Sequence, residues 1–562
     1  MVEVISQSLL FDIGVILIVA SIVAYILRYF RQPLIPAYII AGLILGPLGL
    51  KIIEDVDIIR NISEIGILFL LFIVGLEMDV KKLKKLGLVT IITGFFQVVL
   101  TFLIGFFVAQ RLGFDSLNAV YAGLIIAFSS TMIVIKLLHD KDELNTLHGR
   151  IIIGILFVQD ILVVLALTIL MGTTTFTLVA IIPLLLKVTG LIIFAYLLNR
   201  FVMPAVFRVA ANSSELLFLV AVATCFFFAL GAYMLGFSVA IGGFIAGLTL
   251  ASLPYNLNII GHVSPLKDFF ATIFFVSLGL QLTFVNFASV VKPLFIFLAL
   301  VVLLKPFIVL LILSLLGYDK RNAFVSAVAL AQISEFSLIL VMSVGNVSQE
   351  LFSLTILLGI ISIGLTVYIL KYEMYVYSFF APMLALFEKL SKKHRELDYE
   401  VPDHKKIILF GCSRMGGTFL KSFQRVNKQA LIIDFNPEVI DSLRKERVPC
   451  MYGDMGNKEI LKRINFRHAK VVISTVASAE DNLRLLAYLK KVRSHATVFI
   501  AAQTLDESLT LYDAGADYVL LPTIMSGYMM ANMLQKYMGN KAGLQKLKRD
   551  HLKRLLEMKT NG

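Results

Sequence analysis

Long apolar runs fill the chain up to about residue 385, and they constrain the fold more than any other feature. Of the 562 residues, 58% are hydrophobic and 16% are charged, whereas soluble domains contain roughly a quarter charged residues. A membrane span needs about 20 apolar residues, or fewer where the helix is broken or tilted. We count about thirteen candidate spans: 9–28, 34–50, 62–77, 87–110, 116–138, 148–171, 176–199, 214–232, 235–252, 267–283, 289–316, 322–346 and 351–377. The first run is too long for a cleavable signal peptide, so the sequence predicts an α-helical polytopic membrane protein.

Lysine and arginine set the expected orientation of these spans. Basic segments at 28–32, 81–85, 199–208 and 318–321 fall on one side, and loops on the other side carry almost no positive charge. The positive-inside rule then places the N-terminus outside and the C-terminal part in the cytoplasm, in the cell membrane. The net charge of +13 has the same explanation, so we expect no nucleic acid partner.

Two spans carry polar residues at their centres, which predicts discontinuous helices at a transport site. The two spans are seven apart in order, as expected for two inverted six-span repeats that follow one extra span. An alternative is that the hydroxyls bond back to the preceding turn of an unbroken helix. The residues concerned are Ser129, Ser130 and Thr131 in 116–138, and Gln332, Ser334 and Glu335 in 322–346.

Asp160 lies in the middle of the apolar stretch "GILFVQDILVVLALT". A carboxylate at this depth is protonated, paired or in a water-filled cavity, because its burial costs at least a few kcal/mol. We expect Asp160 to hold a proton or a cation in turn, with the amide oxygen of Gln159 offered to the cation. A single acid favours one proton per cation and therefore electroneutral exchange. The alternative is a structural Asp160 bonded to a neighbouring helix.

Lys305 is a second charge inside an apolar run, and Pro306 after it predicts a disturbed helix. We expect Lys305 to pair with Asp160 when no cation is bound, although a lysine can also extend its ammonium to the membrane surface. Lys187 also falls inside a predicted span, and the sequence assigns it no role.

The chain is expected to divide into a transmembrane exchanger domain (1–386), a linker (387–403), a Rossmann-like regulatory domain (404–540) and a basic helical tail (541–562). After the linker, short strands alternate with helices, as in a parallel doubly wound sheet. The glycine-containing turn "GCSRMGG" follows the first strand, and an acid follows the second at the distance of a ribose-binding residue. The sequence predicts nucleotide binding by Gly411, Ser413, Arg414, Met415, Gly416, Asp434, Phe435 and Asp454. The turn departs from G-x-G-x-x-G at Ser413, so a fold that has lost its ligand is the alternative.

No residues for nicotinamide chemistry are evident, so we interpret the nucleotide as a regulator and the chain as no enzyme. The three cysteines, Cys225, Cys412 and Cys450, show no metal-ligand spacing, and we expect no transition metal.

The segments "FLLFIVGLEMDVKKLKKLG", "AFSSTMIVIKLL", "GILFVQD", "IGGFIAGLTLAS", "FFVSLGLQL" and "AQISEFSLIL" resemble the Kef-type branch of the second cation:proton antiporter family, whose members carry a C-terminal RCK (TrkA-N) nucleotide-binding domain. The resemblance implies a homodimer in which a core domain moves Asp160 across the barrier as an elevator. It also implies exchange of potassium for protons, regulation by AMP, NAD(H) or a related adenine nucleotide, and an ancillary cytoplasmic regulator. Sodium for protons is the alternative within the same fold.

The chain departs from its glutathione-gated relatives in one loop, where "YNLNIIGHVSPLKD" has no acid before Asp268. We therefore do not expect gating by glutathione adducts, nor a second regulatory subdomain. An RCK-gated cation channel is a rival of a different class, but no selectivity-filter motif is present. A membrane-anchored nicotinamide enzyme and a carrier of organic solutes fit the residues less well.

Overall fold

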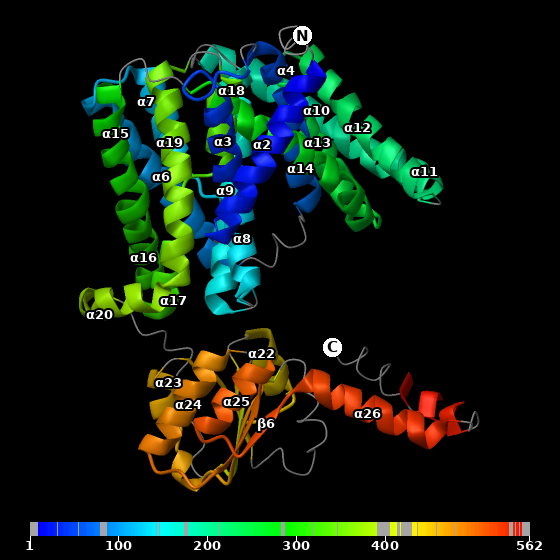
Figure 1. The fold of residues 1–562 in the computed structure, drawn as a ribbon, viewed down its shortest axis with the longest axis vertical. Coiled ribbons are helices and arrows are strands. Elements are labelled where there is room, and N and C mark those ends of the chain that lie inside the picture. Colours follow the sequence, from blue (N-terminus) through cyan, green and yellow to red (C-terminus); the bar gives the residue numbers. More distant parts are fainter. Residues whose placement is uncertain are drawn as a thin grey trace. The chain divides into compact units, whose positions relative to one another are not determined.

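The computed structural model of the chain (Figure 1) contains two compact units, each with its own apolar core. The first unit comprises Met1–Leu144 and His148–Lys393, and the second comprises Asn145–Leu147 and His394–Gly562. The structure describes residues 9–552 apart from 31, 54–55, 79–86, 142, 145, 173–177, 212, 283–286, 319, 345–346, 391–404, 413–415, 417–429, 435–436, 454, 457, 477, 539–542, 546 and 550.

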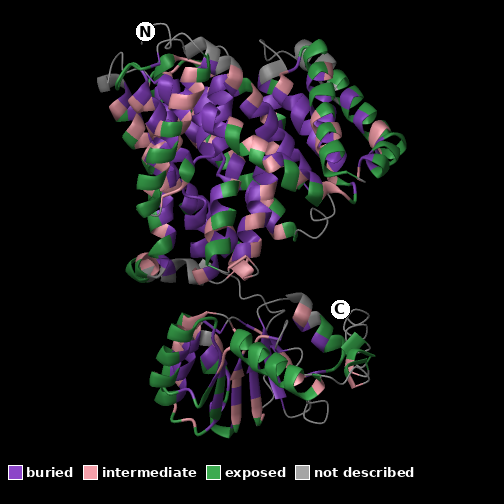
Figure 2. Cartoon of the chain, turned by 45° about the vertical axis from the view of Figure 1, so that its right-hand side comes forward, coloured by how far each residue is buried: buried purple, intermediate pink, exposed green. Residues whose placement is uncertain are grey.

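The first unit is helical, and the predicted spans coincide with helices or broken helices, except that the span predicted at 351–377 runs past the end of α19 (Gln349–Lys371) into a separate helix, α20 (Glu373–Leu390). Figure 2 shows its buried residues gathered between the helices, with exposed residues on the outer faces. Among the described residues, eight spans are long and apolar enough to cross a membrane, and α3 and α13 are shorter apolar helices. The end of α10 (Leu178–Phe201) and α11 (Met203–Ala210) form a pair that is bent by 52°. The other helices outside the two breaks are α2 (Leu9–Tyr29), α3 (Leu34–Leu45), α4 (Val56–Glu77), α6 (Leu88–Arg111), α9 (Leu147–Gly172), α12 (Ser214–Met234), α13 (Val239–Ala251), α14 (Asn256–Leu280), α19 (Gln349–Lys371) and α20 (Glu373–Leu390).

Two pairs of glycines allow helices of the first unit to touch through their backbones. Gly42 of α3 meets Gly279 of α14, and Gly75 of α4 meets Gly247 of α13. A Cβ atom on Gly279 would lie 2.1 Å from the carbonyl oxygen of Ile39, and one on Gly247 would approach α4 as closely. Small residues at such contacts are typical of membrane helix packing.

The two predicted helix breaks are present. One separates α7 (Ser116–Ala127) from α8 (Thr131–Asp140), and the other separates α17 (Lys320–Ala329) from α18 (Glu335–Ser343). Each second half begins with a serine cap: the Ser130 hydroxyl accepts from Ile133 N–H (3.3 Å), and the Ser334 hydroxyl accepts from Phe336 N–H (3.1 Å). The serines therefore start new half-helices, as N-cap residues do, and do not bond back to the preceding turn.

The predicted disturbance at Lys305 is also present. A π-helical turn, η1 (Leu300–Leu304), lies between α15 (Phe287–Ala299) and α16 (Lys305–Leu315). Pro306 lacks a backbone donor, and its ring disfavours the regular α-helical turn before it. The wider turn directs Lys305 into the interior, where it is fully buried.

One predicted loop is wrong. The sequence analysis predicted a loop that continues to about residue 267. In the structure, α14 already begins at Asn256 and contains Pro265. Ile259 and Val263, four residues apart, are fully buried and give the segment a helical apolar face. Average hydropathy does not reveal that face because polar residues surround these two positions.

The second unit contains a six-stranded parallel sheet in the order β3-β2-β1-β4-β5-β6. This order confirms the predicted doubly wound fold, with the reversal of strand order between β1 and β4. The strands are β1 (Ile407–Phe410), β2 (Ala430–Asp434), β3 (Cys450–Tyr452), β4 (Val471–Ser474), β5 (Thr497–Ala501) and β6 (Tyr518–Leu520). The described helices include α22 (Pro437–Lys445), α23 (Lys458–Arg463), α24 (Ala479–Lys491), α25 (Leu505–Asp513) and α26 (Pro522–Tyr537).

Candidate functional site

The two helix breaks of the first unit are bonded to each other. The Ser129 hydroxyl donates to the Leu330 carbonyl (3.0 Å), and the Ser337 hydroxyl donates to the Ile125 carbonyl (2.8 Å). The breaks supply these contacts because interrupted helices leave carbonyls and N–H groups without intrahelical partners. The bonded breaks form a crossing at which two half-helix N-termini and two half-helix C-termini meet.

Asp160 of α9 lies at the N-terminus of α8. The Thr131 hydroxyl is 2.9 and 3.0 Å from the two carboxylate oxygens, and only 8% of Asp160 is exposed. The partial positive charge of a helix N-terminus favours an anion at this position. Asp160 therefore sits where fixed dipoles stabilise its ionised carboxylate.

Glu335, the first residue of α18, reaches the same half-helix. Its carboxylate lies close enough to Ser130 and Met132, at the start of α8, to interact with both. Its Oε2 atom has no hydrogen-bond partner among the described residues. The sequence analysis treated Asp160 as the single acid of the mechanism, and the structure brings a second buried carboxylate to the same helix end.

Gln332 lies within the second break and is fully buried. Neither its amide oxygen nor its amide nitrogen has a hydrogen-bond partner in the part of the chain that the structure describes. An unsatisfied buried amide costs free energy, so Gln332 is a candidate ligand at the second break.

Both side-chain amide atoms of Gln159 are already hydrogen-bonded within the protein. Its amide oxygen accepts from the Ser129 N–H (2.9 Å), and its amide nitrogen donates to Gln97 of α6. Gln97 in turn donates to the Ala127 carbonyl (2.9 Å), at the end of α7. The two glutamines thus bind backbone groups on both sides of the first break. The sequence analysis instead expected the Gln159 oxygen to face a cation.

Lys305 does not form the expected ion pair with Asp160 in this structure. Its ammonium donates to the Phe128 carbonyl (2.8 Å) and the Gln332 carbonyl (2.9 Å), one in each break. Carbonyls at half-helix C-termini carry partial negative charge, which explains why a fully buried ammonium settles there. Lys187, by contrast, is exposed and donates to the Leu235 carbonyl (3.0 Å).

The sequence analysis missed a polar cluster at the far ends of the helices that carry the site. Lys141, after α8, lies 3.0 Å from Glu373 of α20 and 3.7 Å from Glu143. His148 of α9 contacts Glu143 (3.2 Å) and Asn322 of α17 (3.3 Å). Asn322 and Glu373 are far in the sequence from Lys141, Glu143 and His148, so no local pattern predicts that they join the cluster. A further missed acid, Glu77 of α4, lies within electrostatic range of Asp160.

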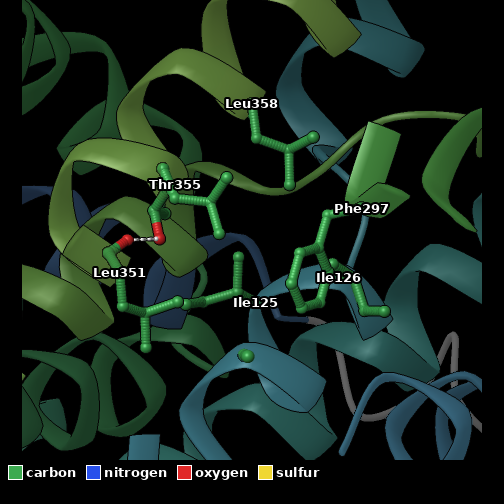
Figure 3. A pocket seen from close by; sticks show the side chains of 8 residues that line it. Ile125, Ile126, Phe297, Leu351, Thr355 and Leu358 are labelled. Atoms are coloured by element: carbon green, nitrogen blue, oxygen red, sulfur yellow. Dashed lines mark hydrogen bonds between the residues drawn. The ribbon is translucent and has the colours of Figure 1, made fainter. Parts of the chain in front are cut away.

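Figure 3 shows a gap in the same bundle between α7, α19 and Phe297 of α15. Apolar side chains line it except for Thr355, whose hydroxyl donates to the Leu351 carbonyl (2.7 Å). The gap has no room for a water molecule. It is a packing defect and not a ligand site.

In the second unit, the predicted turn lies at the carboxyl ends of β1, β2 and β4. Gly411 has φ +80°, which favours glycine, and a Cβ atom on Gly416 would lie 2.0 Å from the Gly411 carbonyl oxygen. A carboxylate oxygen of Asp434 accepts from Cys412 N–H (2.6 Å), and the Thr475 hydroxyl donates to the Gly411 carbonyl (3.0 Å). This is the position at which doubly wound sheets bind ligands.

Five of the predicted nucleotide-binding residues fall outside the described residues: Ser413, Arg414, Met415, Phe435 and Asp454. So does the helix expected after Gly416. Burial raises the pKa of the Cys412 thiol to about 12, so the thiol beside the turn stays protonated at neutral pH. Among the described residues, no group of three or more His, Cys, Asp or Glu could hold a metal ion.

Comparisons with known proteins match both units. The sodium/hydrogen exchanger transmembrane family matches residues 15–372, and the TrkA-N domain matches residues 407–522. The chain is 28% identical over 508 residues to the glutathione-regulated potassium-efflux system protein KefC of Escherichia coli strain K12, covering 85% of this chain and 77% of that protein.

Two solved structures are similar to parts of the chain. The sodium proton antiporter MjNhaP1 from Methanocaldococcus jannaschii is 20% identical, with 68% of this chain and 98% of that chain covered and a TM-score of 0.49. The TrkA-N domain of the inner membrane protein ybaL from Escherichia coli is 20% identical, with 24% of this chain and 99% of that chain covered and a TM-score of 0.22.

Proposed function

Since the exchanger match covers more than half of it, the chain belongs to the sodium/hydrogen exchanger family, and we propose that it exchanges potassium for protons. It is a multi-pass cation:proton antiporter with a TrkA-N domain and not an enzyme. The observation that carries the proposal is the pair of buried carboxylates, Asp160 and Glu335, at the N-terminus of α8. Potassium is preferred to sodium because KefC, by its name, is a potassium-efflux protein.

A count of fixed charge at the crossing favours one proton per cation. Each half-helix end carries about half an elementary charge. The two C-termini then contribute about one negative charge, which the ammonium of Lys305 neutralises. The two N-termini contribute about one positive charge against the two carboxylates, which leaves about one negative charge. One potassium ion or one proton neutralises this remainder, so each substrate displaces the other and exchange is electroneutral.

The residues around the carboxylates supply further ligands in this proposal. The Thr131 hydroxyl bonds to Asp160, Ser130 interacts with Glu335, and Gln332 offers an amide that has no partner among the described residues. Ser129, Ser334, Gln159 and Lys305 hold the two breaks in position. Glu77 is exposed at the end of α4, where water screens its charge.

The test is exchange in proteoliposomes, followed with a pH-sensitive dye inside the vesicles. The Asp160→Asn variant should lose potassium-dependent proton movement. The Asp140→Asn variant should retain it, because Asp140 is exposed at the other end of the same half-helix. Retained exchange in Asp160→Asn would contradict the mechanism. Faster exchange with sodium than with potassium would favour a sodium antiporter, and a voltage generated by exchange would contradict electroneutrality.

We further propose that an adenine nucleotide, AMP or NAD(H), binds at the turn after β1 and regulates exchange. Gly411 permits close approach of a phosphate, and Asp434 lies at the end of β2, where ribose hydroxyls bind in such sheets. The bond from Cys412 N–H to Asp434 already joins the acid to the turn. Binding is measured by calorimetry with the full chain in detergent. Asp434→Ala should weaken AMP or NADH binding at least about tenfold, equivalent to about 1.4 kcal/mol, while exchange without nucleotide persists.

The remaining parts of the proposal concern assembly and topology. We infer a homodimer whose core domain moves as an elevator, with residues 1–386 in the membrane, 387–403 as linker, 404–540 as regulatory domain and 541–562 as tail. The basic segments place the N-terminus outside and the regulatory domain in the cytoplasm. Chemical crosslinking in the membrane and labelling of single cysteines from either side would test these assignments.

A further inference from the structure

The helix α20 has an inward face that is fixed to the first unit. The positions 373, 377, 380 and 384 recur at i, i+4, i+7 and i+11, which is one face of a helix. Glu373 and Leu384 are buried there. The rings of Tyr377 and Phe380 pack 5.6 and 6.4 Å from the ring of Phe324 in α17. Figure 1 shows α20 lying across the ends of α16, α17 and α19.

The opposite face of α20 is apolar and exposed. Tyr375 is 79% exposed and Phe379, four residues later, is 78% exposed. Tyr372, immediately before the helix, is also exposed. An exposed aromatic face is unusual on a surface that water covers, because burying an aromatic side chain of this size gains about 1.5–3 kcal/mol.

This face continues an exposed stripe of the last span without interruption. The exposed apolar residues follow one another at intervals of three and four residues, from the middle of α19 to the middle of α20. They are Ile361, Leu365, Tyr368, Tyr372, Tyr375 and Phe379. The exposed surface of a membrane span contacts lipid, so the stripe leads from the lipid-facing surface of α19 directly onto α20.

The chemistry along the stripe changes in the order expected at a membrane boundary. Aliphatic residues occupy α19, tyrosines occupy its end, and the ammonium of Lys371 lies over the ring of Tyr372 at 5.1 Å. Tyrosines and lysines are enriched where the hydrocarbon meets the headgroups. A helix that lies in this plane presents aromatic residues to the acyl boundary and its other face to protein or water.

We propose that the outward face of α20, defined by Tyr372, Tyr375 and Phe379, binds the lipid surface of the leaflet in which α19 ends. The helix then rests in the headgroup plane and does not leave the membrane with the linker. Glu373, on its inward face, forms an ion pair with Lys141 (3.0 Å). The loop after α8 is thereby attached to an element that the bilayer holds in place.

The chain contains no tryptophan, so a single introduced tryptophan reports on its own surroundings. The experiment uses the full chain in vesicles of phosphatidylcholine and phosphatidylglycerol, with Phe379→Trp as the probe and the adjacent Phe380→Trp as the inward control. Phospholipid brominated close to the headgroup should reduce the emission of the Phe379→Trp variant about twofold, as expected for a side chain at the acyl boundary. The Phe380→Trp variant should be quenched much less.

Two results would overturn the proposal. Quenching of the Phe379→Trp variant by aqueous iodide but not by brominated lipid would place the face in water. Blue-shifted emission that neither quencher reduces would place it against protein, such as a second copy of the chain. If either variant fails to fold, Tyr375→Trp replaces the outward probe and Tyr377→Trp replaces the inward control, and the same criteria apply.

Discussion

Replacing Lys305 by methionine isolates what the buried ammonium contributes to the crossing. Methionine keeps most of the length and apolar contacts of the lysine stem. It removes the donor that joins the Phe128 and Gln332 carbonyls at 2.8 and 2.9 Å. Both helix breaks then lose their common partner while the surrounding packing is retained.

The expected cost follows from the two carbonyls. A buried acceptor without a partner costs about 1–3 kcal/mol, so the pair costs about 2–6 kcal/mol. The variant also avoids burying an ammonium, which by itself costs several kcal/mol, and this saving offsets part of the loss. We therefore expect the Lys305→Met variant to be destabilised by about 1–2 kcal/mol.

The measurement is the rate at which detergent-solubilised protein loses its monodisperse peak in size-exclusion chromatography at a fixed temperature. If the crossing opens in the rate-limiting step, the loss corresponds to an unfolding rate increased roughly 5- to 30-fold. Lys187→Met is the matched control, because exposed Lys187 bonds one carbonyl at the surface, where substitutions usually change stability by about 0.5 kcal/mol or less. Equal decay rates for the two variants would refute the bridging role of Lys305.

The polar cluster beyond α8 gives two pH predictions with opposite trends, both measured as melting temperatures against pH. Burial raises the pKa of Glu143, but the bond from His148 and the charge of Lys141 outweigh burial and hold it below the usual 4.5. Its contribution to stability is therefore present above pH 4.5 and is lost as the pH falls through the folded-state pKa, so Glu143→Gln should destabilise the protein at neutral pH and progressively less in acid. Burial and the charge of Glu143 raise the pKa of Glu373 above its usual 4.5. Wild type should therefore lose stability relative to the Glu373→Gln variant as the pH rises above 4.5. If the melting temperatures of the two variants depended on pH in the same way, both assignments would be contradicted.

The sequence predicts the membrane architecture well because the bilayer imposes a local requirement. Each span must be long and apolar on its own, so hydropathy identifies it without knowledge of its neighbours. The breaks are predictable for the same reason, because a serine cap such as Ser130 or Ser334 interrupts an apolar helix visibly in the sequence. The doubly wound sheet is predictable because strands and helices alternate regularly between residues 407 and 537.

The partners of the buried polar groups could not be predicted, because the chain fold decides them. The amide of Gln159 could bind a cation or a backbone, and only the packing of α6 beside α9 directs it to Gln97 and Ser129. Likewise, nothing near Lys305 in the sequence indicates that carbonyls 177 and 27 residues away are its acceptors. Residue type shows that a buried charge needs a partner, and the crossing of the helices determines which partner it finds.

The position of Lys305 matters for how the site can bind its substrates. An ammonium paired with Asp160 would compete directly with any arriving cation, and exchange would require that pair to break in every cycle. An ammonium held by two half-helix C-termini neutralises their dipoles and leaves the carboxylates at the N-termini to the cation and the proton. In the proposed exchange, Lys305 keeps its carbonyl contacts in both occupied states and holds the crossing together while Asp160 and Glu335 change occupants.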